Sequence, residues 1–129
     1  MTTLPETKAC KVNIENEWLT ISFNQPEKRN ALTGELTDDI KNIFDAARDD
    51  LGVRGVTMRG EGGIFCAGGD LKMFKTGFQG GEQGMKDVEE ASALTGAFFD
   101  MINSYPKPVV MLAEGAAMAG GLGMLCAGD

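Results

Sequence analysis

Two glycine-rich turns contain the residues best suited to chemistry. The first turn covers residues 64–71 (IFCAGGDL) and the second turn covers residues 114–123 (EGAAMAGGLG). Each follows an apolar run typical of a strand and precedes a predicted helix, so each can leave backbone N–H groups unpaired where the helix dipole favours negative charge. Glycine also lets the backbone approach a ligand closely. Side by side, the two turns would form an oxyanion pocket for a carbonyl that gains negative charge during reaction.

These turns and two further motifs resemble the successive motifs of the crotonase (enoyl-CoA hydratase/isomerase) superfamily. The four motifs are residues 26–32 (PEKRNAL), 65–71 (FCAGGDL), 106–110 (PKPVV) and 115–123 (GAAMAGGLG). The resemblance implies an α/β fold of the crotonase type, made of ββα repeats in a spiral. It also implies that residues 1–129 are the N-terminal part of a single domain of roughly twice this length, so that the C-terminal part is incomplete here.

The same resemblance implies roles for particular residues. It places two oxyanion donors on the backbone N–H groups of Gly69 and Gly120, which would polarise a thioester carbonyl and stabilise an enolate-like intermediate. Without the resemblance, either glycine cluster is more often an ordinary turn. The residues implied to contact an acyl-CoA substrate are Lys28, Arg29, Ala31, Ala67, Asp70 and Leu71.

Four positions in these motifs have alternative interpretations. Lys28 and Arg29 would meet coenzyme A phosphates, as cations on a loop can, or would be solvated side chains of a polar loop. Asp70 also suits the N-cap of a helical turn, and both of its roles can hold together. Cys66, just before the glycines, suggests a thiol nucleophile, but a small buried packing residue is favoured because the chain has no histidine to activate it.

Gly123 departs from the pattern of the family. In hydratases that the chain resembles, this position is commonly a glutamate that acts as general acid or base, and the second carboxylate would lie beyond Asp129. Some isomerases, hydrolases and dehalogenases of the family also lack the first carboxylate. Gly123 therefore shifts the prediction away from a two-glutamate hydratase. Glu114, at a strand end, is a candidate replacement, for which a structural hydrogen-bonding role is the favoured alternative.

Composition excludes several classes of function. The chain has 129 residues, 43% of them apolar, and a net charge of −7 without a basic run, which argues against nucleic acid or a membrane surface as partner. It has neither a signal-like start nor an apolar run of about 18 residues, so we expect a soluble, cytoplasmic protein. The absence of histidine and of CxxC spacing excludes a Ser-His-Asp triad, a zinc ribbon and His-based metal sites within this sequence.

The apolar pattern predicts alternating strands and helices. We expect a hairpin from residues 10–14 and 18–23, a helix from an N-cap at Thr33 to about residue 50, and strands at residues 55–58 and 109–113, the last covered on both faces. A helical turn is expected at residues 71–74 and a helix at residues 86–104. Residues 76–84 contain four glycines and predict a mobile loop. Five acidic residues fall mostly off the apolar stripe of the first helix, as on a solvated face: Asp38, Asp39, Asp45, Asp49 and Asp50.

The sequence thus predicts an acyl-CoA-binding enzyme that hydrates an enoyl-CoA or isomerises its double bond. No metal or redox cofactor is implied, because coenzyme A arrives as part of the substrate, and the resemblance implies a homotrimer or hexamer. The alternative from another class is a truncated, catalytically silent fragment or binding subunit. Dinucleotide binding is a weak third interpretation, since residues 115–123 lack the GxGxxG spacing and no suitable ribose-binding acid follows.

Overall fold

The regular structure begins with the β-hairpin that the alternating apolar residues predict. In the computed structural model, which describes residues 3–129, β1 (Cys10–Glu15) pairs antiparallel with β2 (Trp18–Phe23). Asn16 and Glu17 form the connection, with φ angles of 53° and 64°. Two-residue hairpin turns use such left-handed conformations because they match the twist of the strands.

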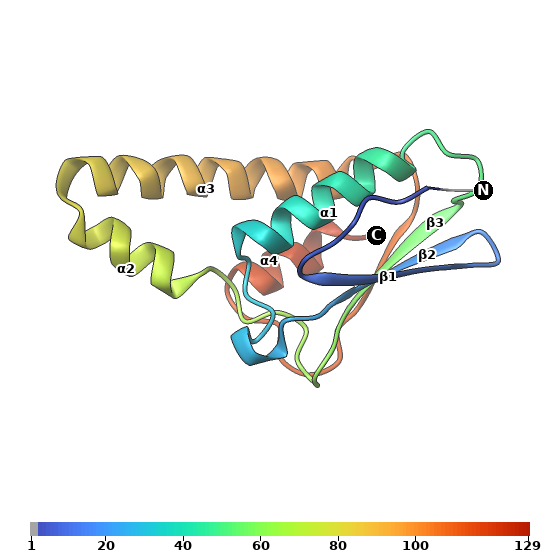
Figure 1. Ribbon diagram of the computed structural model, residues 1–129, viewed down its shortest axis with the longest axis horizontal. Helices are drawn as coiled ribbons and strands as arrows, with labels where there is room; N and C mark the ends of the chain where they lie inside the picture. The colour runs from blue at the N-terminus through green and yellow to red at the C-terminus, as the bar shows by residue number, and fades with distance from the viewer. Residues whose placement is uncertain (1–2) are drawn as a thin grey trace.

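Two parallel strands complete the sheet, which has the order β1-β2-β3-β4. β3 (Gly55–Gly60) pairs with β2, and β4 (Val109–Leu112) pairs with β3. Helices occupy the crossovers between parallel strands, as such connections require. They are a short 3-10 helix η1 (Pro26–Lys28), then α1 (Gly34–Ala47), α2 (Leu71–Gln79) and α3 (Gly81–Asn103), with α4 (Gly120–Ala127) after β4 (Figure 1). The α/β class is confirmed.

Helix α1 begins as predicted and supplies one side of the core. The Thr33 side chain caps the helix by accepting a hydrogen bond of 3.2 Å from the backbone N–H of Leu36. The apolar stripe is fully buried through Leu36, Ile40, Ile43, Phe44 and Ala47. The expected end near residue 50 is too late, because the helix stops at Ala47 and leaves Leu51 95% exposed, outside the stripe.

Asp39 is not part of a solvated face. It is 5% exposed, and its Oδ2 accepts hydrogen bonds from the backbone N–H groups of Lys8 (2.9 Å) and Ala9 (2.6 Å). The carboxylate therefore ties the segment before β1 to α1. Hydrogen bonds to a charged acceptor are among the stronger ones that a folded chain makes.

Asp39→Ala should lower the free energy of unfolding by about 2–4 kcal/mol, because two backbone donors lose their charged acceptor in a buried place. The measurement is chemical denaturation followed by circular dichroism. Asp38→Ala, at the exposed neighbouring position, is the matched control and should change the free energy by no more than about 0.5 kcal/mol. Equal midpoints for the two variants would contradict the role given to Asp39.

The prediction of a mobile loop at residues 76–84 is wrong. Those residues belong to α2 and α3, which meet at Gly80 with Gly81 at a φ of 65°. A Cβ atom at Gly84 would overlap the carbonyl oxygen of Gly77, so these glycines allow two helices to touch. Helix α3 consequently starts at Gly81, well before residue 86, and the α2–α3 hairpin extends away from the sheet (Figure 1).

Strand β4 is covered less completely than its apolar run predicts. Val109 is fully buried, but Val110 and Leu112 are 40% and 46% exposed. The strand lies at the edge of the sheet and pairs with β3 alone among residues 3–129. The prediction that both faces of this strand are covered is therefore not met in this structure.

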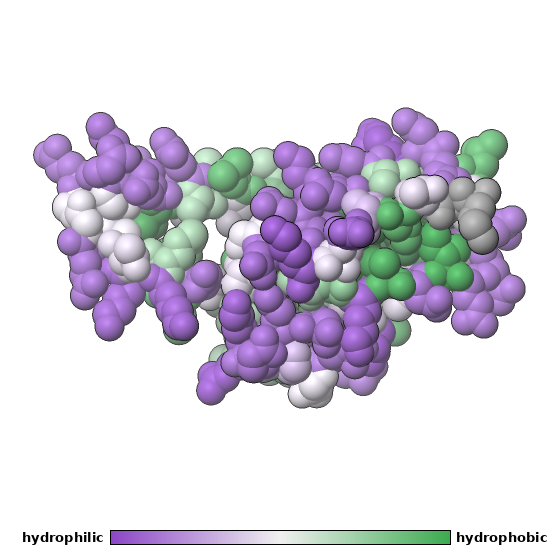
Figure 2. All heavy atoms as spheres, in the orientation of Figure 1, coloured by the Kyte–Doolittle hydropathy of each residue, from purple (hydrophilic) through white to green (hydrophobic). Residues whose placement is uncertain are grey.

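Hydrophilic side chains predominate on the face of the molecule seen in Figure 2. Hydrophobic residues gather on the side where the sheet lies. Among the helices of residues 3–129, none has both the length and the apolar character that crossing a membrane requires.

Candidate active site

The two glycine-rich turns lie side by side. Cys66 of the first turn and Ala117 of the second form a parallel bridge. The backbone N–H groups of Phe65 and Cys66 donate to the carbonyl of Ala116, at 3.0 and 3.2 Å, and that of Met118 donates to the carbonyl of Cys66 at 3.0 Å. The turns follow the neighbouring parallel strands β3 and β4, which deliver them to the same edge of the sheet.

The N–H groups of Gly69 and Gly120 are neighbours at this edge. A Cβ atom at Gly120 would lie 3.8 Å from the backbone nitrogen of Gly69, and one at Gly68 would lie 3.3 Å from the backbone nitrogen of Gly120. Within residues 3–129, neither of these two N–H groups donates a hydrogen bond to another protein group. Both glycines line the same pocket, which has a volume of about 310 Å³. Two neighbouring free donors on residues that line one pocket suit an anionic oxygen.

Ala119 holds the peptide group that carries the Gly120 N–H in an uncommon orientation. Its backbone angles are φ 49° and ψ −120°, in a region that residues with a side chain rarely adopt. Such a conformation costs about 1–3 kcal/mol and tends to occur at functional sites. Ala119 directly precedes α4, so the Gly120 N–H lies at a helix start where the dipole favours negative charge. An alanine gave no sequence signal of this role.

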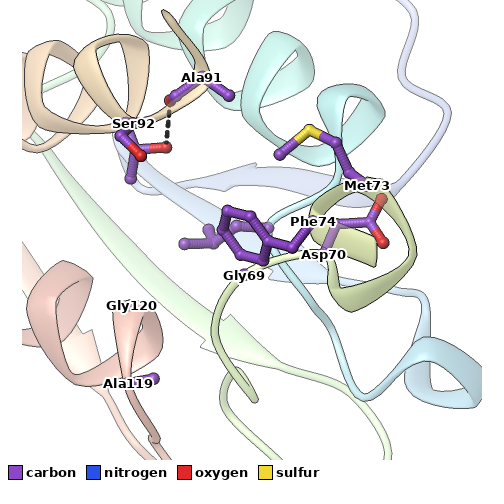
Figure 3. A pocket seen from close by; sticks show the side chains of 10 residues that line it. Gly69, Asp70, Met73, Phe74, Ala91, Ser92, Ala119 and Gly120 are labelled. Carbon is purple, nitrogen blue, oxygen red and sulfur yellow. Dashed lines mark hydrogen bonds between the residues drawn. The ribbon is translucent and has the colours of Figure 1, made fainter. Parts of the chain in front are cut away.

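The walls of the 310 Å³ pocket come from the α2–α3 hairpin. Figure 3 shows Met73 and Phe74 of α2, Ala91 and Ser92 of α3, and the Gly120 backbone at the start of α4 around it. Mostly apolar walls with a few polar groups are typical of pockets for small molecules. These wall residues are not predictable from the sequence pattern, because the loop expected across the hairpin hides the faces that the two helices turn toward each other.

A second pocket, of about 570 Å³, adjoins the first. The two share Gly69, Asp70, Phe74 and Ala119 among their lining residues. All of the residues predicted to contact an acyl-CoA line this second pocket, namely Lys28, Arg29, Ala31, Ala67, Asp70 and Leu71. The eight predicted site residues, these six and the two glycines, therefore line two adjoining pockets.

The loop after β2 forms the outer wall of this second pocket. Arg29 accepts a hydrogen bond from the backbone N–H of Ala67 (3.0 Å), and the N–H of Leu32 donates to Gly68 (2.7 Å), which fixes the loop against the first turn. Lys28 and Arg29 are exposed, and no carboxylate of residues 3–129 lies within ion-pair distance of either. Their charges are therefore free to meet an anionic ligand.

Asp70 has the capping role that was its alternative interpretation. Its Oδ1 accepts a hydrogen bond of 3.1 Å from the backbone N–H of Lys72, and it is the N-cap of α2. It also lines both pockets. The cap fixes the start of α2 beside Gly69, so the two roles of this residue are compatible.

The surroundings of Glu114 and Cys66 indicate structural roles for both residues. Glu114 is 64% exposed, lines neither pocket, and lies 3.7 Å from the guanidinium of Arg59. Cys66 is completely buried, and this burial raises the pKa of its thiol, while a hydrogen bond from the Gly68 N–H has a smaller effect in the opposite direction. The thiol stays protonated at neutral pH and is a poor nucleophile. Packing is the better description of Cys66.

An aromatic ring occupies the space beside Gly123. A Cβ atom at this position would lie 2.9 Å from Cε2 of Phe99, a residue of α3. A side chain at position 123 would therefore require the ring to move. The packing around position 123 therefore fits a glycine and leaves no room for a carboxylate side chain while the Phe99 ring stays in place.

Comparison with known proteins gives the family. The family model described as "Enoyl-CoA hydratase/isomerase" matches residues 18–129. The chain is 36% identical over 93 residues to the "Probable enoyl-CoA hydratase" of Bacillus subtilis (strain 168), which covers 72% of this chain and 34% of that protein.

Solved structures agree. The crystal structure of an enoyl-CoA hydratase from Polaromonas sp. JS666 matches with a TM-score of 0.82 and 32% identity, and Pseudomonas aeruginosa AtuE matches with a TM-score of 0.83 and 30% identity. Each match covers 95% of this chain and 46% of the solved chain, so the sequence spans about half the length of these relatives. The family match and the shared fold together show that this chain belongs to the enoyl-CoA hydratase/isomerase (crotonase) family.

Proposed function

We propose that the protein containing this chain binds an acyl-CoA thioester and stabilises the enolate of its acyl group with the N–H groups of Gly69 and Gly120. The observation that carries this proposal is the pair of neighbouring amides, without a donor contact to the rest of residues 3–129, on one pocket of about 310 Å³. A thioester carbonyl gains negative charge on oxygen as its α-carbon loses a proton. Donors already aimed at that oxygen lower the barrier without having to reorganise.

The two pockets suggest how the substrate lies. The acyl group would enter the smaller pocket between α2 and α3, while the pantetheine and nucleotide would follow the larger pocket past Ala67 and Leu71. Lys28 and Arg29 would meet the phosphates at its outer end, where a flexible cation and a planar guanidinium both suit phosphate oxygens. In this proposal coenzyme A arrives with the substrate, and no metal or redox cofactor takes part.

The surroundings of Gly123 bear on the reaction. Hydration by two glutamates requires a carboxylate at this position, yet the position is a glycine against the Phe99 ring. We therefore favour double-bond isomerisation, or another reaction that needs one carboxylate, over two-glutamate hydration. That carboxylate would belong to a part of the protein outside residues 1–129, since the relatives are longer than this chain.

The experiment uses the full-length protein that contains this chain. Binding of an acyl-CoA is measured by calorimetry, and hydration of crotonyl-CoA and isomerisation of a 3-enoyl-CoA are measured in parallel. We expect saturable binding and isomerisation that exceeds hydration. Binding without turnover would favour the silent binding subunit, and failure to bind any acyl-CoA would overturn the proposal. Light scattering on the same sample tests the proposed homotrimer or hexamer.

A further inference from the structure

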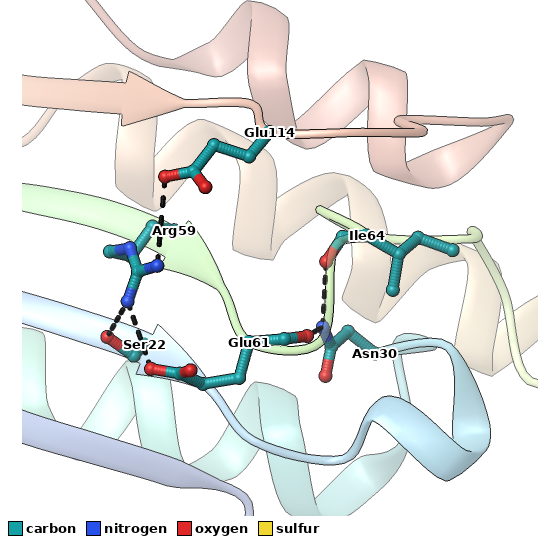
Figure 4. A network of polar contacts seen from close by, with 6 residues as sticks. All are labelled: Ser22, Asn30, Arg59, Glu61, Ile64 and Glu114. Carbon is teal, nitrogen blue, oxygen red and sulfur yellow. Dashed lines mark hydrogen bonds and ion pairs between the residues drawn. The ribbon is translucent and has the colours of Figure 1, made fainter.

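A buried asparagine connects the loop after β2 to the start of the first turn. Asn30 is 0% exposed, and all three of its side-chain hydrogen bonds are to backbone groups. Its Oδ1 accepts from the N–H of Gln25 (2.9 Å), while its Nδ2 donates to the carbonyls of Glu61 (3.0 Å) and Ile64 (2.9 Å). Figure 4 shows the Asn30 side chain facing the carbonyl of Ile64, with Glu61 beside it.

The backbone around Asn30 is adapted to this contact. Arg29 and Asn30 both have left-handed φ angles, of 54° and 51°, and asparagine tolerates this conformation better than most residues. On the opposite side, a Cβ atom at Gly60 would lie 3.0 Å from Nδ2 of Asn30 and would overlap the carbonyl oxygen of Ile64. The amide group therefore occupies a space that the end of β3 leaves open for it.

Asn30 and its neighbours hold both ends of the segment that leads to Gly69. The Asn30 side chain fixes the carbonyls of Glu61 and Ile64, at the beginning of that segment. The adjacent backbone holds its far end through the Ala67 N–H and the Gly68 carbonyl. The residue directly after Gly68 is Gly69, so the direction of its N–H depends on this attachment.

We propose that Asn30 is a positioning residue for the Gly69 N–H, an inference that rests on the proposed function. The side chain supplies one acceptor and two donors at fixed places, which matches one N–H and two carbonyls. Aspartate has the same shape but only acceptors when ionised, so it would repel the two carbonyls. Because a donor displaced by about 1 Å can cost on the order of 100-fold in rate, a modest shift of this segment would be felt in the chemical step.

A second set of polar contacts extends this network to Arg59 and to the second turn. The backbone carbonyl of Glu61 accepts a hydrogen bond from Asn30, and its carboxylate lies 2.9 Å from Nη1 of Arg59. Arg59 also lies 3.7 Å from Glu114, the first residue of the second turn. Arg59 is partly exposed, whereas Asn30 is fully enclosed. Of the two residues, Asn30 is thus the one with no water to replace its lost partners.

The test compares Asn30→Asp with a second buried variant, Asp39→Ala, which breaks two contacts to the backbone before β1 and none to either turn. The readouts are kcat, KM for the acyl-CoA, and the absorption of bound cinnamoyl-CoA, a conjugated thioester whose band moves to longer wavelength when donors polarise its carbonyl. We expect Asn30→Asp to lower kcat by about 10- to 100-fold, to change KM by less than about threefold and to reduce the band shift. Asp39→Ala should leave kcat and the band shift unchanged despite its lower stability.

Other outcomes separate the positioning role of Asn30 from the proposed function on which it rests. A wild-type protein that binds cinnamoyl-CoA without a band shift would contradict the oxyanion hole, and the positioning role with it. A normal shift in the wild type that persists in a folded Asn30→Asp, with kcat unchanged, would overturn the role of Asn30 alone. If Asn30→Asp does not fold, Asn30→Ser takes its place with the same expected results, because a hydroxyl can donate to only one of the two carbonyls.

Discussion

Replacement of the Gly120 amide by an ester should lower kcat for an acyl-CoA substrate by about 100- to 1,000-fold, equivalent to about 3–4 kcal/mol. Incorporation of glycolic acid at position 120 exchanges the N–H for an oxygen and leaves the main-chain path unchanged. In the structure this N–H starts α4, has no protein acceptor among residues 3–129, and lines the pocket of about 310 Å³. Its loss should therefore affect the reaction and not the fold.

The neighbouring position provides a matched control. The N–H of Gly121 donates to the Met118 carbonyl at 2.7 Å. An ester at position 121 therefore removes a structural hydrogen bond of about 1 kcal/mol and leaves the Gly120 N–H in place. A loss of kcat in the position-121 ester as large as that in the position-120 ester would contradict the role of the Gly120 N–H.

Gly121→Ala should separate the two turns and abolish most activity. A Cβ atom there would overlap the carbonyl oxygen of Cys66 and lie 2.9 Å from its carbonyl carbon, and backbone atoms cannot turn aside as side chains do. Overpacking of this kind costs about 1–3 kcal/mol. The displaced atoms belong to the ladder that joins the turns, because the Cys66 carbonyl accepts from the Met118 N–H. We therefore expect both a lower melting temperature and a loss of turnover.

Gly96→Ala is the control for this prediction, since both glycines lie in helices. Apart from the neighbouring backbone of its own helix, α3, no heavy atom of residues 3–129 lies within 4 Å of a Cβ at Gly96. Alanine there should raise stability by up to about 1 kcal/mol, because glycine is the poorer helix former. Calorimetric melting of the two variants tests the pair, and a Gly121→Ala protein as stable and active as Gly96→Ala would disprove the close packing of the turns.

The parts of the fold that were predictable are those with a local pattern. Alternating apolar residues located the β1–β2 hairpin, and the capping threonine at position 33 located the start of α1. The α2–α3 hairpin was not predictable in this way. Its glycines, including Gly77 and Gly84, have the composition of a loop, yet they allow two helices to come into contact. Only the packing partner distinguishes these two uses of glycine.

In the candidate site, too, the predictable parts are those with a local sequence pattern, and the parts that depend on tertiary packing are not predictable. Motif resemblance indicated Gly69 and Gly120, whose proposed contribution is a backbone N–H group and therefore depends little on side-chain packing. It gave no information on the pocket walls at Met73 and Ser92, because these depend on how α2 and α3 face each other. The strained backbone of Ala119 and the buried contacts of Asn30 also arise from tertiary structure, and the residue types alone do not indicate them.

The central claim is that the Gly69 and Gly120 N–H groups polarise a thioester carbonyl, and the absorption spectrum of bound cinnamoyl-CoA tests it most directly. This measurement needs neither turnover nor knowledge of the natural acyl group. The structure predicts a band shift to longer wavelength in the wild type, reduced by the ester at position 120 and kept by the ester at position 121. Tight binding of cinnamoyl-CoA with an unshifted band would contradict the claim.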